Sequence, residues 1–141
     1  MRVKHVLAEK GSVVHAVEPD DPVLEAIRRM AEHHVGALLV TRGTELVGIV
    51  SERDYARKVV LLGRSSAETP VWQIMSAPVF TVGREATVNE CLELMTQRRI
   101  RHLPVVEGDA ILGVLSIGDC VKSVIAEQQR HIEELERFIR S

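Results

Sequence analysis

The sequence predicts an α/β (α+β) fold of two β-α-β-β-α repeats that pack about a pseudo-twofold axis and carry a C-terminal helical extension. The first observation is an internal repeat, because a shift of 65 residues aligns residues 13–60 with 78–125 without a gap. The second is that the apolar periodicities agree in both copies. Identical pairs include Met30 and Met95, Gly48 and Gly113, Ser51 and Ser116, and Asp54 and Asp119. Since about 60 residues bury little apolar surface alone, we expect both copies to form one domain.

The first copy spans residues 1–62 and starts with a lead-in segment and a short strand at 13–17. Asp21 is the predicted N-cap of a helix that has Pro22 in its first turn. The apolar face of this helix carries Val23, Ala26, Ile27 and Met30 at helical spacing. Strands at 37–41 and 46–51 follow, joined by a hairpin that contains Gly43, and a second helix begins near Arg53.

The second copy spans residues 71–126, after a linker of loop composition at 63–70. Its lead-in, 71–75, resembles 3–7. Thr87 and Glu90 have the spacing of a helix capping box. The remaining predicted elements are strands at 103–106 and 111–116 and a helix from about Gly118.

The C-terminal extension, residues 127–141, continues that last helix to about Arg140, because no helix breaker follows Asp119. Its side chains at spacings of three and four are Val121, Val124, Ile125, Gln128, Ile132, Leu135 and Ile139. An apolar stripe of this kind needs cover. Two arrangements are open: the helix folds back on its own pair of repeats, or it helps to clasp a homodimer, which we favour.

The composition is that of a folded protein, with 45% hydrophobic and 27% charged residues and a net charge of −2. This balance gives no reason to expect nucleic acid or an anionic membrane as a partner. No apolar run approaches the roughly 18 residues of a membrane span, and the first residues lack the apolar core of a signal peptide. Two cysteines without a CxxC motif suit a reducing compartment. We therefore expect a cytoplasmic protein.

The second copy resembles the CBS motif, and two such motifs in tandem form a Bateman module. The resemblance lies in Thr81-Val82, in Leu103-Pro104-Val105-Val106, and in the ending Gly113-Val114-Leu115-Ser116-x-x-Asp119. The first copy has Leu39 where the second has Pro104. The chain is most similar to small stand-alone bacterial CBS-pair proteins. Family members bind AMP, ADP, ATP or S-adenosylmethionine, and some of this subgroup resemble NAD binders.

The residues that end each motif suit a nucleotide. A carboxylate can accept hydrogen bonds from both ribose hydroxyls, which is the role we assign to Asp54 and Asp119. Ser51 and Ser116 can present hydroxyl and backbone N–H groups to phosphate. The structural alternatives are helix capping by the two aspartates and simple turn formation by the two serines.

The candidate phosphate cations are distributed unevenly. By resemblance to the regulatory γ subunit of AMP-activated protein kinase, Arg101 and His102 occupy positions that meet phosphate, and Arg53 is a further candidate. In related pairs such cations reach across to the site of the other copy, which favours the Asp54 site. A solvated basic run is the alternative for the arginines.

Adenine is expected between apolar strands, with hydrogen bonds mainly from the main chain. The residues assigned to this cleft are Val35, Leu38, Thr81, Ile100, Leu103 and Pro104. Gly48 and Gly113 would leave room for a ligand or for a facing backbone.

No nucleophile–base pair, Walker loop or metal-ligand spacing is present, so the sequence does not indicate an enzyme or a metal protein. Cys91 and Cys120 are expected to be packing residues. We expect a regulatory module that senses AMP, ADP, ATP or NAD(H) and signals through an unidentified regulated protein. The alternatives are a constitutive scaffold or dimerisation protein with degenerate clefts and, least favoured, a hydrolase or redox protein.

Overall fold

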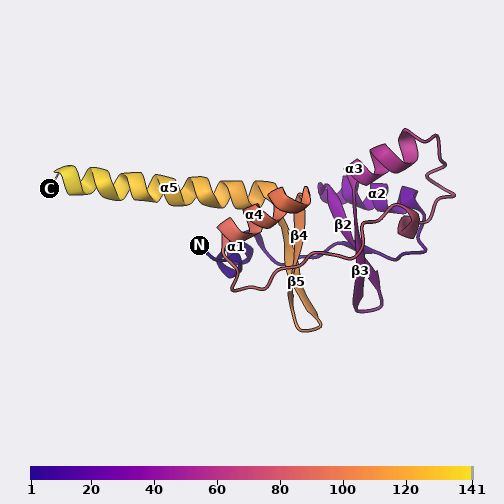
Figure 1. Ribbon diagram of the computed structural model, residues 1–141, viewed down its shortest axis with the longest axis horizontal. Coiled ribbons are helices and arrows are strands. Elements are labelled where there is room, and N and C mark those ends of the chain that lie inside the picture. Colours follow the sequence, from indigo (N-terminus) through magenta and orange to yellow (C-terminus); the bar gives the residue numbers. More distant parts are fainter. Residues whose placement is uncertain (141) are drawn as a thin grey trace. The chain divides into compact units, whose positions relative to one another are not determined.

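The computed structural model describes residues 1–140 and divides the chain into two compact units that repeat the same arrangement of elements (Figure 1). Unit 1 combines Met1–Ser12 with Thr81–Ser141, and unit 2 is the continuous segment Val13–Phe80. Each unit has a helix, a β-hairpin and a further helix in the same order, so the mixed α/β fold of two repeats is confirmed.

Unit 2 is built on a three-stranded sheet of order β1-β2-β3, formed by β1 (Ala16–Val17), β2 (Ala37–Arg42) and β3 (Glu45–Ser51). The first pair of strands is parallel and the second antiparallel. The helix α2 (Val23–His33) connects β1 to β2 in the chain. Its Val23, Ala26 and Met30 are buried, as their spacing predicts. After the sheet come α3 (Glu52–Tyr55), a π-helical turn (Ala56–Val60) and a 3₁₀ turn (Val71–Gln73).

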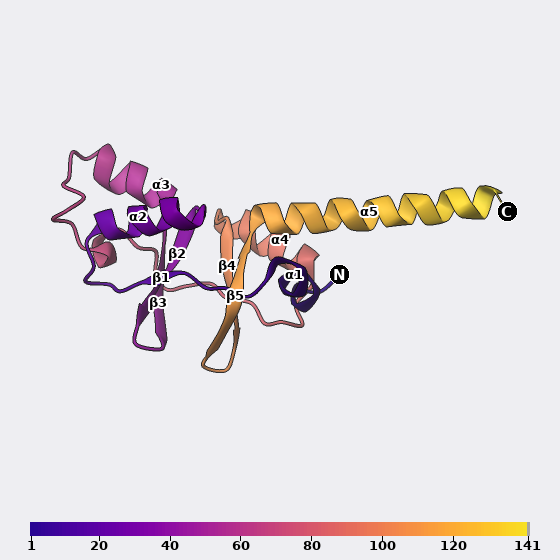
Figure 2. The ribbon, with the colours of Figure 1, turned by 180° about the vertical axis from the view of Figure 1, so that it is seen from behind.

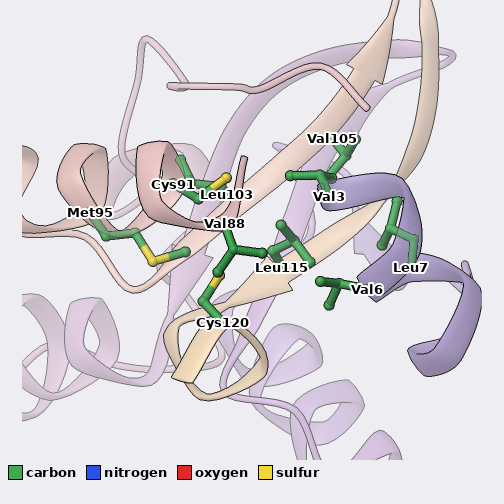
Figure 3. Close-up of a cluster of buried hydrophobic side chains, with 10 residues drawn as sticks. All are labelled: Val3, Val6, Leu7, Val88, Cys91, Met95, Leu103, Val105, Leu115 and Cys120. Carbon is green, nitrogen blue, oxygen red and sulfur yellow. The ribbon is translucent and has the colours of Figure 1, made fainter. Parts of the chain in front are cut away.

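Unit 1 contains α1 (Val3–Lys10), α4 (Val88–Arg98), the antiparallel pair β4 (His102–Glu107) and β5 (Ala110–Ser116), and α5 (Ile117–Arg140). Val82 forms a parallel bridge to Val105, at the position where β1 pairs in the other unit. The core of unit 1 gathers side chains from all of these elements (Figure 3). Its buried members are Val3, Val6, Leu7, Val88, Cys91, Met95, Leu103, Val105, Leu115 and Cys120.

Each lead-in segment packs on the other copy of the repeat. The sequence grouped residues 3–7 with the first copy, yet α1 lies in unit 1, where the Val3 N–H donates to the Ala86 carbonyl at 2.9 Å. The second lead-in lies in unit 2, where the Val71 N–H donates to the Asp21 carbonyl at 2.9 Å. A sequence repeat shows that two segments are equivalent but not which copy each one covers.

The two strand glycines admit the lead-in side chains. A Cβ added at Gly48 would lie 2.5 Å from Met75 Sδ, and one added at Gly113 would lie 2.8 Å from Leu7 Cδ2. Ser76, which follows the second lead-in, also exchanges two backbone hydrogen bonds with Ile49. The room that these glycines leave is therefore filled by the protein itself and not by a ligand.

Two helix starts differ in how they are capped. Thr87 is the N-cap of α4, and its hydroxyl accepts the Glu90 N–H at 3.1 Å. The N-cap of α2 is Pro22 and not Asp21. The Asp21 carboxylate instead accepts the Glu18 N–H at 2.9 Å, so it closes the preceding turn.

Helix α5 is 24 residues long, and it extends well beyond α1 and α4 in both views (Figures 1 and 2). From Ile125 to Arg140 every residue is exposed, so the extension is not buried against the core of unit 1, the unit to which it belongs. Across residues 1–140, no helix has the length and apolar character that a membrane crossing requires.

Candidate functional site

The Ser51 and Asp54 side chains form a compact hydrogen-bonded pair where β3 ends and α3 begins. The Asp54 Oδ2 accepts the Ser51 N–H at 2.9 Å and the Ser51 hydroxyl at 3.0 Å, and the Asp54 N–H donates to Ser51 Oγ at 3.2 Å. This is a capping box in which Ser51 is the N-cap and Asp54 the third helical residue. The capping alternative is therefore realised, with the serine rather than the aspartate as the cap.

The same arrangement recurs in unit 1 at the junction of β5 and α5. The Ser116 N–H donates to Asp119 Oδ2 at 2.8 Å, and the Asp119 N–H donates to Ser116 Oγ at 3.1 Å. Capping and ligand binding are compatible, because a carboxylate has about four acceptor sites and these bonds use only part of them. The fold thus holds each aspartate in one fixed orientation.

Each aspartate has a lysine beside it that the sequence analysis did not identify. Lys10, at the end of α1, donates to Asp119 Oδ2 at 2.5 Å and to the Val114 carbonyl at 2.6 Å. Lys58 lies 3.5 Å from Asp54 Oδ1 and donates to the Ile74 carbonyl at 3.0 Å. Lys58 follows Asp54 by four residues, a helical spacing that could have indicated it. Nothing in the sequence connects Lys10 with Asp119, because the exchanged lead-in brings them together.

The surroundings of Asp119 favour its charged form. Burial acts to raise the pKa of this carboxyl. The hydrogen bonds from Lys10 and from the Ser116 N–H outweigh burial and hold the pKa of Asp119 below its usual value. Asp119 is therefore an ionised acceptor at neutral pH.

His102 lies directly opposite Ser116 in the register of β4 and β5. Paired residues of an antiparallel ladder point to the same face of the sheet. Burial is the main reason that the pKa of His102 is lowered; Lys10 and Arg101 lower it further, while Asp119 acts in the opposite direction. Three elements of unit 1 thus bring Lys10, His102 and Asp119 close enough to influence one another.

The two other predicted phosphate cations lie on the surface. Arg101 is exposed just before β4, and its carbonyl accepts the Ile117 N–H at 2.8 Å. Arg53 is exposed in the first turn of α3. Within residues 1–140, neither side chain forms a hydrogen bond or ion pair with the Ser-x-x-Asp cluster of its own unit.

The six residues assigned to the adenine cleft do not share one environment. Leu38 and Leu103 are completely enclosed in the cores of their own units, so these two assignments need correction. Their side chains point toward the core because strand residues alternate between faces. The alternation places Leu39 and Pro104, the next residues along each strand, on the opposite face, where both are also buried.

The other predicted cleft residues lie near the strand ends. Val35 and Ile100 are half-buried and follow equivalent residues in the left-handed conformation, His34 and Arg99. Thr81 is exposed and immediately precedes Val82.

The two cysteines are buried packing residues. Cys91 and Cys120 both lie in the unit 1 core (Figure 3). Burial raises the pKa of each thiol to about 11, so neither is a thiolate at neutral pH. Within residues 1–140, no group of three or more His, Cys, Asp or Glu side chains is placed to hold a metal ion.

Two Ser-x-x-Asp clusters on repeated β-hairpin units define a tandem CBS-domain protein. The family model for the CBS domain matches residues 10–61 and 71–126, so the chain belongs to this family. Tandem CBS domains are generally regulatory ligand-binding modules. A solved protein with CBS domains from Burkholderia ambifaria is 49% identical, with a TM-score of 0.87 over 91% of this chain and 96% of that one.

CBS-domain proteins of lower sequence identity are also similar to this chain. The CBS domain-containing protein CBSX3, mitochondrial, of Arabidopsis thaliana is 42% identical over 85% of this chain. The chain spans only 61% of the length of CBSX3 and 22% of two further Arabidopsis relatives. A CBS domain protein from Pyrobaculum aerophilum, solved as a complex with AMP, is 28% identical, with a TM-score of 0.74 over 84% of this chain and 89% of that one.

Proposed function

We propose that this chain is a regulatory module that binds an adenine nucleotide, of the class of AMP, ADP, ATP or NAD(H), and signals through a partner protein. The observation that carries the proposal is the repeated cluster in which a fixed, partly exposed aspartate lies beside a lysine, as Asp54 does with Lys58 and Asp119 with Lys10. The AMP complex of the relative from Pyrobaculum aerophilum supports the choice of ligand class.

The chemistry of each cluster fits the two polar parts of a nucleotide. An ionised carboxylate accepts hydrogen bonds from ribose hydroxyls, which is the role proposed for Asp54 and Asp119. A phosphate needs cations and N–H or O–H donors. In unit 1 we assign this role to Ser116, His102 and Lys10, with Arg101 at the rim. In unit 2 we assign it to Ser51, Lys58 and Arg53.

The adenine ring is proposed to lie against the sheet face opposite the core, where its edge can bond to main-chain groups. Val35 and Ile100 are half-buried and Thr81 is exposed, so these three keep their proposed contact with the base. Pro104 is buried too, but it lies outside the core cluster of unit 1 and on the other face of the strand, and on that ground it keeps its proposed role. Signalling then requires that the nucleotide favour one arrangement of the module over another.

Calorimetric titration with AMP, ADP, ATP, NAD, NADH and S-adenosylmethionine tests the proposal. We expect saturable binding of at least one adenine nucleotide and loss of binding in the double variant Asp54→Ala with Asp119→Ala. Asp20→Ala is the matched control, since Asp20 is an exposed aspartate outside both clusters. An absence of heat with every ligand at millimolar concentration would leave the second candidate, a constitutive scaffold. The long exposed α5 is the observation that favours that candidate.

A further inference from the structure

The apolar stripe on α5 forms a regular heptad pattern. Its members lie at alternating spacings of four and three residues, and they are Val121, Ile125, Gln128, Ile132, Leu135 and Ile139. In a coiled-coil heptad, Ile125, Ile132 and Ile139 take position a, and Val121, Gln128 and Leu135 take position d. The five apolar members are each between 44% and 81% exposed.

This stripe differs from the side of α5 that holds the helix to unit 1. Cys120 and Ser123 are the buried residues of the helix, and Val124 packs against the core. At 3.6 residues per turn, the centre of the stripe lies about 110° around the helix from this packed side. The stripe begins beside unit 1 and runs for about 27 Å, at 1.5 Å per residue, without contributing to the core of that unit.

We propose that the stripe is a dimerisation surface for a second copy of this chain, and that the two α5 helices form a parallel two-stranded coiled coil. β-Branched residues at a with leucine at d favour two strands, and here all three a positions are isoleucine. Most helical stability in proteins comes from packing of an amphipathic face, and here packing of the first turns of α5 within unit 1 fixes the start of the helix.

The single polar core position explains why a parallel pair is favoured. In a parallel pair, Gln128 of one chain meets Gln128 of the second copy, and the two amides can hydrogen-bond to each other. In the antiparallel register that superposes the stripes, Gln128 faces Ile132 and its amide is buried without such a partner. A polar residue at one core position commonly fixes register and oligomer state in this way.

The flanking positions are compatible with this arrangement. Position g of one heptad lies near position e of the following heptad on the other chain, which pairs His131 with Glu136 of the second copy. Both residues are exposed on α5. The outward-facing positions b, c and f are mainly charged, with Arg130, Glu133, Glu134 and Arg137 among them, which suits a water-exposed outer surface.

Sedimentation velocity of the full chain over a range of concentrations tests the association. We expect a dimer for the unmodified chain and at least about tenfold weaker association for Ile132→Glu, equivalent to about 1.4 kcal/mol. Arg130→Glu is the matched control, since it changes charge at an outward-facing position of the same helix. A monomeric unmodified chain, or a dimer that Ile132→Glu leaves equally tight, overturns the proposal.

Cross-linking tests the orientation without disrupting the helix. Gln128→Cys should form an intermolecular disulfide under mild oxidation, whereas Arg130→Cys should not. The native Cys91 and Cys120 are completely buried and give little background. A dimer that Ile132→Glu weakens but that gives no disulfide at position 128 overturns the parallel arrangement. This surface is independent of the proposed nucleotide sites, so failure of nucleotide binding leaves both tests unaffected.

Discussion

The Lys10 ammonium group contacts the Asp119 carboxylate at 2.5 Å, although 109 positions separate the two residues in the chain. This contact ties α1 to the start of α5 and places a cation at one of the two proposed ribose acceptors. The corresponding contact in unit 2 is looser and local, since Lys58 lies 3.5 Å from Asp54 on the next turn. The two repeats thus share the aspartate but differ in the lysine that contacts it.

This difference predicts unequal nucleotide sites. We expect Asp54→Ala to weaken binding more than Asp119→Ala, because Asp119 already accepts a 2.5 Å hydrogen bond from Lys10, whereas Lys58 lies 3.5 Å from Asp54 and leaves that carboxylate freer for a ligand. A charge-assisted hydrogen bond is worth about 1.5–3 kcal/mol, which corresponds to roughly a 10- to 150-fold loss of affinity for Asp54→Ala. Calorimetry on both single variants measures the difference. A larger loss for Asp119→Ala would show that the Asp54 site is not the stronger one.

The Lys10–Asp119 contact also predicts a pH-dependent contribution to stability. The folded-state pKa of Asp119 is lowered, so its stabilising effect is present above the unfolded pKa and is lost as the pH falls through the folded value. Lys10→Met should reduce the free energy of unfolding by about 1 kcal/mol at neutral pH, a modest value because Lys10 is partly exposed.

Urea unfolding at neutral and acid pH measures this effect. The difference in the free energy of unfolding between Lys10→Met and the unmodified chain should disappear at acid pH. Lys122→Met, at an exposed lysine of α5, should have little effect at either pH. A gap that persists unchanged below the folded pKa of Asp119 would assign the stabilisation to packing of the lysine stem.

His102 gives a spectroscopic measure of the same cluster. Burial, then the charges of Lys10 and Arg101, lower its pKa, so we expect the ring to titrate below pH 6.5 in an NMR titration. Removing one positive charge with Lys10→Met should raise the pKa of His102 toward its ordinary value. An unchanged His102 titration in this variant would mean that Lys10 does not act on the ring.

Substitution of the two strand glycines, Gly48 and Gly113, is expected to lower the stability of the fold by different amounts. Gly48→Ala would place a methyl group 2.5 Å from Met75 Sδ and 3.2 Å from the Ser76 carbonyl oxygen, while Gly113→Ala meets only the Leu7 side chain. Overpacking of this kind costs about 1–3 kcal/mol, and we expect Gly48→Ala to be the more damaging because a backbone atom yields less easily.

Thermal unfolding of the two variants compares these costs. Gly83→Ala is the control, since a Cβ there meets nothing within 4 Å. Equal melting temperatures for Gly48→Ala, Gly113→Ala and Gly83→Ala would mean that the lead-in segments move aside without cost.

Local patterns predicted most of the fold. Helical spacing located the buried face of α2, and the glycine in each hairpin located the β2–β3 and β4–β5 turns, because these features depend on neighbouring residues. The repeat also placed Ser51, Asp54 and their counterparts correctly at the junctions of strand and helix.

The errors concern long-range packing. Leu38 and Leu103 were assigned to a ligand surface because strand alternation does not show which face becomes the core until the helices are placed. Lys10 was missed for a similar reason, since its contact depends on which repeat α1 covers. The capping role given to Asp21 failed because an equivalent local bond, to the Glu18 N–H, was available to the same carboxylate.

The exchange of lead-in segments has a consequence for biosynthesis. Unit 2 is one uninterrupted stretch, Val13–Phe80, so all of its residues are translated before those of the second hairpin. Unit 1 needs Met1–Ser12 together with Thr81 and later residues. The apolar side chains of α1 therefore lack their packing partners in unit 1 while unit 2 is being synthesised. Residues 1–12 are thus translated before unit 2 but reach their packing partners only after unit 2 has been made.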